Sequence, residues 1–243
     1  IDFALAPRRV LRVLLAGIAL LVTLSVVGQA GVYFLPDFPL RDALASLFYV
    51  AQEASVPTLF SVLQLLAAAV LLAAIAFAHQ RAGNPGSRTW YLLAGLVAYL
   101  ALDESAMIHE RFIGPTRGLL GIETGPLLFA WVIPAAIASV VFALATRRFV
   151  AALPRHTRRL VISAFVLFVG GALGVELVGS AYASAHGREE FIYTLIVAVE
   201  EAVEMAGAAV LVYALLAYIP VGLPAARWSA WVVLSPAKAA PFR

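Results

Sequence analysis

The chain of 243 residues is 63% hydrophobic and only 13% charged, with a formal net charge of +3. Such a composition is far from that of an ordinary soluble domain, and no nucleic-acid partner is expected. The absence of cysteine excludes disulfides, zinc–thiolate sites and thiol catalysis.

Six apolar runs reach the length of about 20 residues that a helix needs to span a bilayer. In chain order, spans are expected near 11–34, 57–79, 90–110, 127–146, 160–183 and 190–218. The first run follows arginines, as in a signal peptide, but it is too long for one and is interpreted as a retained transmembrane helix. Thr124 is the expected cap of the fourth span and Pro126 a first-turn residue.

These runs predict an all-α, integral membrane bundle of six transmembrane helices. Residues 1–218 are expected to form one domain, and 219–243 an interfacial or cytoplasmic tail that carries Trp228 and Trp231. With the N-terminus inside, the outer side holds only four of the 17 basic residues, namely Arg41, Arg111, Arg117 and Arg188. The positive-inside rule therefore places both termini in the cytoplasm, for a multi-pass protein of the bacterial inner (plasma) membrane in contact with membrane lipid.

Acidic residues occur at similar depths in four of the expected spans. Glu53 begins the second span from outside, and Asp103 to Glu110 closes the third. Glu176 lies about two turns from the outer end of the fifth span, and Glu200 to Glu204 about three turns into the sixth. Because an ionised carboxylate in hydrocarbon is costly unless it is paired, hydrated, protonated or bound to a cation, these residues predict one polar site in the outer half of the bilayer.

Helical spacing predicts that the deepest acids face the interior of the bundle. Glu200 and Glu204 lie about 40° apart around a helix axis. Glu176 shares its face with Gly179 and Ser180, and such small residues let a neighbouring helix approach closely. Like charges at this spacing repel, so a bound cation or shared protons are required. The alternative to a bound cation is that some of these side chains are protonated and only form hydrogen bonds.

The third span ends in a mixed polar segment. Asp103 and Glu110 are expected on one helix face, with Glu104 and His109 flanking it on opposite sides. For Glu110, the alternative to a site role is an ion pair with Arg111 or Arg117.

Two residues of the second span have simpler alternatives. Glu53 stands near a helix N-terminus, where the helix dipole alone stabilises an acid. Gln64 is expected to form a hydrogen bond across helices.

Carboxylates and histidine on neighbouring antiparallel helices are the ligand set of di-iron and di-manganese bundles. Here the Glu-x-x-His signature is missing, because Ala106 lies three residues before His109. A divalent or transition metal ion is expected, with iron, manganese and zinc not distinguished, and no haem. The expected ligands are Glu104, Glu176, Glu200 and Glu204, and further ligands or neighbours are Asp103, Glu201, His109 and Glu53.

Three functions are compatible with this pattern. The first is a metal-binding membrane protein, such as a metal-dependent oxidoreductase or hydrolase that acts on a lipophilic substrate. The second is an accessory subunit of a larger membrane complex, with other membrane subunits as partners. The third is a proton or cation pathway.

Four segments carry a resemblance to a known family. They are Glu-x-x-x-Pro-Thr at Glu53 to Thr58, Asp-Glu…His-Glu at Asp103 to Glu110, Gly-Val-Glu at Gly174 to Glu176, and Glu-Glu-x-x-Glu-Met at Glu200 to Met205. In these segments the chain resembles a family of uncharacterised multi-pass bacterial membrane proteins, over most of residues 45–218. The resemblance implies a membrane-embedded fold and no assigned activity.

Overall fold

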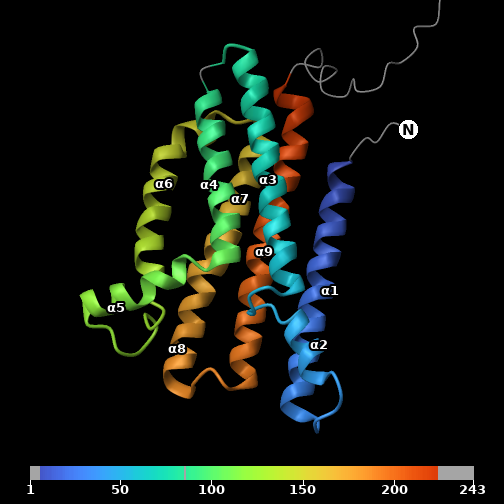
Figure 1. The fold of residues 1–243 in the computed structure, drawn as a ribbon. Coiled ribbons are helices and arrows are strands. Elements are labelled where there is room, and N and C mark those ends of the chain that lie inside the picture. The colour runs from blue at the N-terminus through green and yellow to red at the C-terminus, as the bar shows by residue number, and fades with distance from the viewer. Residues whose placement is uncertain (1–5, 85, 224–243) are drawn as a thin grey trace, which may run out of the picture.

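The computed structural model describes residues 6–84 and 86–223, which form an all-helical bundle without strands (Figure 1). A short 3-10 helix, η1, precedes α5, and a π-helical segment, η2, joins α7 to α8. The elements are α1 (Pro7–Phe34), α2 (Arg41–Phe48), α3 (Val56–Arg81), α4 (Ser87–Ala106), η1 (His109–Phe112), α5 (Ile113–Leu120), α6 (Val132–Ala152), α7 (Arg155–Val169), η2 (Gly170–Val175), α8 (Glu176–His186) and α9 (Phe191–Gly222).

The helices confirm the predicted all-α membrane bundle. Within the described residues, α1, α3, α6, the continuous stretch Arg155–His186 and α9 are each long and apolar enough to cross a membrane. A sixth span results if α4 and residues His109–Leu120, which meet at an angle of 78°, are taken together. The structure therefore has five or six spanning elements in the places where the apolar runs predict them.

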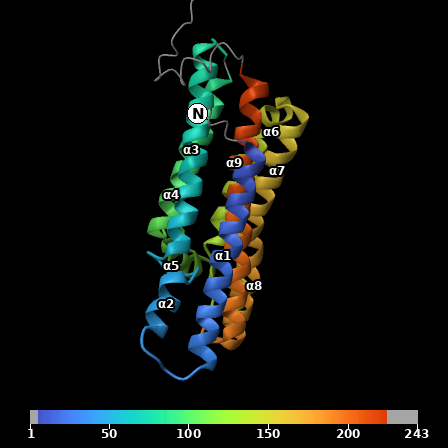
Figure 2. The same ribbon diagram turned by 90° about the vertical axis from the view of Figure 1, so that its right-hand side faces the viewer.

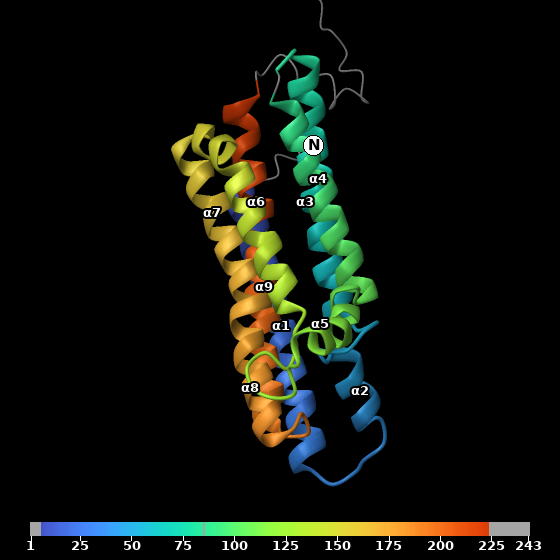
Figure 3. The same cartoon turned by 90° about the vertical axis from the view of Figure 1, so that its left-hand side faces the viewer.

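The spans pack in two groups. Figures 2 and 3 show α3 and α4 side by side on one side of the bundle, opposite α1, α9 and the α7–α8 stretch. The start of α1, the α3–α4 turn, the α6–α7 turn and the end of α9 lie at the same end of the bundle, the upper end in Figure 1. We call this the α3–α4 end and the other the α8–α9 end.

A buried aromatic cluster ties three helices together at the α3–α4 end. His79 Nε2 lies 2.9 Å from the Tyr218 hydroxyl, and its Nδ1 lies 3.2 Å from the Asn84 side-chain nitrogen. The Trp90 ring stacks on His79 with centroids 6.0 Å apart. Since these residues come from α3, α4, α9 and the α3–α4 turn, the cluster fixes the helices relative to one another at this end.

The predicted boundaries of the fourth span are wrong by about five residues. The helix begins at Val132 and ends at Ala152, and Thr124 and Pro126 lie in turns before it. The reason is tertiary: the backbone N–H groups of Gly125 and Phe129 donate to the hydroxyls of Ser184 and Ser180 in α8, at 2.7 and 2.9 Å. Those bonds hold the residues before Val132 against α8, so these residues do not form the first turn of the helix.

Two further boundaries and one short helix differ from the prediction. The third span ends at Ala106 rather than at 110, because Met107 adopts a left-handed conformation with φ of 46°. The short helix α2 was not predicted. At the C-terminal end, α9 continues past residue 218 to Gly222, and Trp228 and Trp231 of the expected interfacial tail lie outside the described residues.

Candidate functional site

Asp103 and His109 form the first part of the site. After the left-handed turn at Met107 the chain folds back, and both the backbone N–H and Nδ1 of His109 lie 2.8 Å from the Asp103 carboxylate oxygens. The carboxylate therefore fixes the orientation of the imidazole ring. Nε2 of His109 has no hydrogen-bond partner within the described part of the chain, so it is free to meet a ligand. The sequence did not predict this contact, because it treated 90–110 as one straight helix.

Trp131, the residue before α6, connects His109 to the deeper acids. Its indole Nε1 donates a 3.0 Å hydrogen bond to Glu176 Oε1, and its ring centroid lies 4.4 Å from that of His109. The bonds that Ser180 and Ser184 accept from residues 125–131 put Trp131 in this place. A tryptophan at the end of an apolar run is typical of a membrane-interface anchor, so this role could not be predicted from the sequence.

Glu176 and Glu200 meet between α8 and α9. Glu176 is the first residue of α8, directly after η2, and its carboxyl group is hydrogen-bonded to that of Glu200, which is only 8% exposed. A π-helical segment shifts the register of a helix and is frequent at functional sites. Here it also presents Gly171 to α9, where an added Cβ would stand 2.7 Å from Glu204 Cγ and 3.1 Å from the Glu200 carbonyl oxygen.

Glu104 brings α4 to the same place. Its carboxyl group is hydrogen-bonded to Ser61 of α3 and interacts electrostatically with Asp103 and His109. It also interacts with Glu201 and Glu204, which in turn interact with each other and with Glu176. These interactions bring together acids of α4, α8 and α9, and we call these five acids the carboxyl cluster: Glu104, Glu176, Glu200, Glu201 and Glu204.

The carboxyl cluster lacks an arginine or lysine partner. Within residues 6–84 and 86–223, the contacts between basic and acidic side chains are those of Arg41 with Asp37 and Asp42 and of His109 with Asp103. None of them involves a member of the cluster. The negative charge that five ionised carboxyl groups would carry is thus not balanced by arginine or lysine in the described chain.

Three predicted polar residues lie apart from the cluster or lack their expected partner. Glu53 is exposed in the turn before α3, where Ser55 rather than Glu53 caps the helix. Glu110 is exposed, and no ion pair with Arg111 or Arg117 is found in the described residues. The interhelical hydrogen bond expected of Gln64 is absent: its side chain is 3% exposed, with neither polar atom bonded.

The unbonded Gln64 side chain lies close along α3 to a residue that contacts the carboxyl cluster. It lies one turn along α3 from Ser61, whose hydroxyl is bonded to Glu104 of the cluster. Buried amides are rarely left without partners, so an unmet donor and acceptor beside the cluster call for a group that is not part of the described chain.

Among the described residues, no three histidine, aspartate or glutamate side chains are already disposed around a single point as metal ligands. The contacts are instead pairwise: Asp103 with His109, Glu176 with Glu200, and Glu104 with Ser61. Metal binding at the cluster therefore requires rotation of carboxyl groups that now bond to one another.

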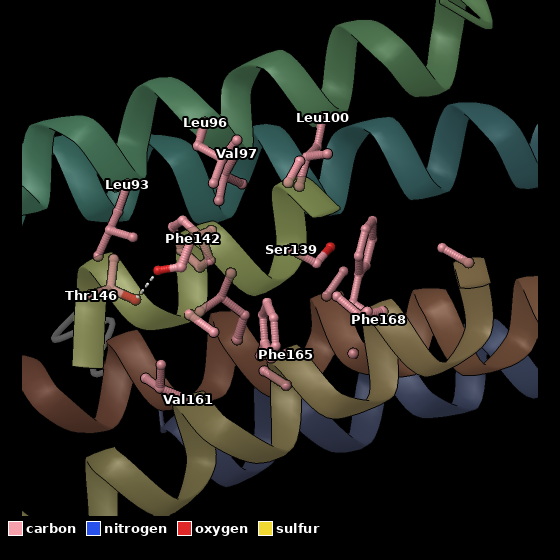
Figure 4. Close-up of a pocket in the computed structure, with 18 of the residues that line it drawn as sticks. Leu93, Leu96, Val97, Leu100, Ser139, Phe142, Thr146, Val161, Phe165 and Phe168 are labelled. Carbon is pink, nitrogen blue, oxygen red and sulfur yellow. Dashed lines mark hydrogen bonds between the residues drawn. The ribbon is translucent and has the colours of Figure 1, made fainter. Parts of the chain in front are cut away.

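A large cavity adjoins the site. It encloses about 800 Å³ between α4, α6, α7 and α9. Figure 4 shows its walls, with leucines of α4, Phe142 of α6, and Phe165 and Phe168 of α7 pointing into it. Asp103, His109 and Trp131 line its end nearest the carboxyl cluster, whereas Arg147 and Arg158 line the opposite end. The cavity is therefore apolar along its length and polar at its ends.

Comparison with known proteins adds a family but no activity. Neither the curated proteins nor the solved structures provide a match to this chain. One family model matches residues 13–219, and its description is "Domain of unknown function (DUF8692)". The match spans the whole helical bundle from α1 to α9, so the chain belongs to the DUF8692 family, as its resemblance to an uncharacterised family led us to expect.

Proposed function

We propose that this protein is a metal-binding protein of the bacterial inner membrane that acts on a lipophilic ligand, with both termini in the cytoplasm. The metal is held by the carboxyl cluster, with Glu104, Glu176, Glu200 and Glu204 as ligands and Glu201, Asp103 and His109 beside them. The observation that carries the proposal is the meeting of five carboxyl groups from three helices with no arginine or lysine to balance them within the described chain. Such a group inside a membrane requires cations or protons.

The chemistry of these donors fits a divalent or transition metal. Carboxylate oxygens with an imidazole nearby suit manganese, iron and zinc, whereas copper–thiolate sites need cysteine, which this chain lacks. Because carboxyl groups must lose their protons to become ligands, protons compete with the metal. We therefore expect metal content to fall as the pH of purification is lowered.

Metal analysis of the purified protein tests the proposal. The wild-type protein is expected to retain close to one equivalent or more of a metal per chain, and the Glu200→Gln, Glu204→Gln double variant much less. Glu53→Gln is the matched control, because Glu53 is exposed and lies apart from the cluster. A wild-type protein without metal after gentle extraction and metal supplementation would contradict the proposal.

The hydrogen bond between the Glu176 and Glu200 carboxyl groups favours a second candidate, a proton pathway. A hydrogen bond between two carboxyl groups needs a proton on one of them, so in the proposed pathway this pair would carry a proton. Proton flux in liposomes that persists in metal-free protein and is lost in Glu176→Gln would support the pathway over the metal site. The accessory-subunit function predicts neither property.

A further inference from the structure

We propose that the cavity between α4, α6, α7 and α9 binds a long-chain lipid with a hydroxyl-bearing head, and that the head donates a hydrogen bond to Nε2 of His109. This inference names the ligand class of the proposed function and rests on it for the role of that ligand as substrate. The binding step itself needs only the cavity and the Asp103–His109 pair.

The shape of the cavity indicates a chain-like ligand. Its wall on α4 runs from Trp90 to Asp103, a length of roughly 20 Å at the rise of an α-helix. Its volume of about 800 Å³ is within the range of ligand sites in proteins. Long, narrow and lined by leucine and phenylalanine, it matches a hydrocarbon chain better than a compact polar molecule (Figure 4).

Polar groups along the wall of the cavity are few, and one of them already has a partner. The Thr146 hydroxyl donates to the Phe142 carbonyl at 2.8 Å, and the other hydroxyls of the lining are those of Ser139 and Tyr99. A head group is therefore best accommodated at one of the two polar ends, and we place it at the end of Asp103, His109 and Trp131, beside the carboxyl cluster.

The chemistry of the Asp103–His109 pair selects the head. The carboxylate of Asp103 accepts from Nδ1 of His109 at 2.8 Å, so Nδ1 carries a proton. As part of this proposal we assign the ring its neutral form, in which Nε2 is an acceptor. The indole N–H of Trp131 is already bonded to Glu176. The group offered to a ligand is thus an acceptor, which an O–H head satisfies and an ether or ester head does not.

The ligand has a route from the bilayer. Val132, at the very start of α6, is the one buried residue of that helix, and no residue of its most apolar stretch is buried. The helix that closes the cavity toward lipid is therefore held by few contacts along its length, so a lipid can enter sideways beneath it.

Photolabelling in nanodiscs tests the inference. The probe is a long-chain primary alcohol with a diazirine on its chain, and unlabelled alcohol and its methyl ether are the competitors. For the wild-type protein, labelling is expected on α4, α6 and α7, and the alcohol should compete about fivefold better than the ether, as the loss of one hydrogen bond implies. Equal competition by alcohol and ether would overturn the assignment of the head to His109.

Three variants separate the parts of the inference. Ala138→Trp fills the cavity and is expected to reduce labelling about tenfold or more, whereas Ile137→Trp, on a side chain that is 62% exposed, should leave it unchanged. His109→Phe keeps a ring of similar size and should bind alcohol and ether alike. Unchanged labelling in Ala138→Trp would refute the cavity as the binding site.

Metal content, measured on the same samples, keeps the two proposals distinct. Specific labelling of a metal-free protein would contradict the proposed metal site and leave the lipid site in place. Bound metal together with unspecific labelling would contradict the lipid site and leave the proposed metal site in place.

Discussion

At the scale of single residues, the site is organised by Asp103. Its two carboxylate oxygens accept from the backbone N–H and from Nδ1 of His109, so one side chain both closes the turn after α4 and fixes the imidazole. The Asp103 side chain is 14% exposed, which limits how well water can replace those bonds. Its effect on stability should therefore exceed that of a surface ion pair.

We expect Asp103→Asn to lower the free energy of unfolding by about 1–3 kcal/mol, because an amide cannot accept both bonds and would turn its NH₂ group toward His109. Reversible unfolding in mixed micelles measures the change. Glu110→Gln, exposed and seven residues further on, is the matched control and should be neutral. If both variants were equally stable, the bonds between Asp103 and His109 would be energetically unimportant.

At the scale of helices, the close contact of η2 with α9 positions the carboxyl cluster. Gly171 meets α9 at Glu200 and Glu204, so an added methyl group would clash with Glu204 Cγ at 2.7 Å and press on main-chain atoms at 3.1 and 3.2 Å. Its neighbour Gly170 has open space within 4 Å of an added Cβ. The two glycines thus offer a matched pair within one π-helical segment.

Gly171→Ala is expected to destabilise the protein by about 1–3 kcal/mol, since the added methyl group would force the Glu204 side chain and the adjoining backbone of α9 to shift. Gly170→Ala should be neutral or slightly stabilising, because alanine is the better helix former. Unfolding experiments on both variants, together with their metal content, check this prediction. Equal stability of the two variants would show that the helices separate without cost.

The sequence predicts those parts of the architecture that depend on residues close together in the chain, and not those that depend on contacts between distant segments. The spans and the depth of Glu104, Glu176 and Glu200 follow from apolar runs and helical rise, which are local properties. The start of α6 and the contact between Trp131 and Glu176 do not, because hydrogen bonds from residues 125 and 129 to α8 decide them.

The site in particular could be predicted only in part. The convergence of acids was predicted, but the left-handed Met107 that returns His109 to Asp103 has no sequence signal, since methionine rarely adopts that conformation. Likewise, nothing in the pattern of residues 160–183 predicts the π-helical turn that directs Glu176 toward Glu200.

At the scale of the whole molecule, the arrangement of the bundle makes topology testable. The α3–α4 and α6–α7 turns lie at the same end as the start of α1 and the end of α9 (Figure 1), as the prediction of two cytoplasmic termini requires. Because the chain has no cysteine, any single introduced thiol reports its side of the membrane without background.

We expect Ala82→Cys and Ala152→Cys, both exposed, to react with an impermeant maleimide only after the cells are opened. Glu189→Cys, in the exposed α8–α9 turn, should react in spheroplasts with an intact inner membrane. The reverse pattern would invert the orientation and move the carboxyl cluster to the cytoplasmic leaflet.

The sparse packing of α6 against the rest of the bundle affects how this protein should be studied. Other parts of the protein cover little of that helix, since only Val132 of α6 is buried, so in a membrane acyl chains are expected to pack along most of its length. A change of medium from bilayer to detergent therefore alters the neighbours of α6 directly, and with them the width of the adjoining space. The thickness and fluidity of the host membrane become variables that set the behaviour of the protein, and measurements in micelles and in native lipid should differ most for properties that depend on this helix.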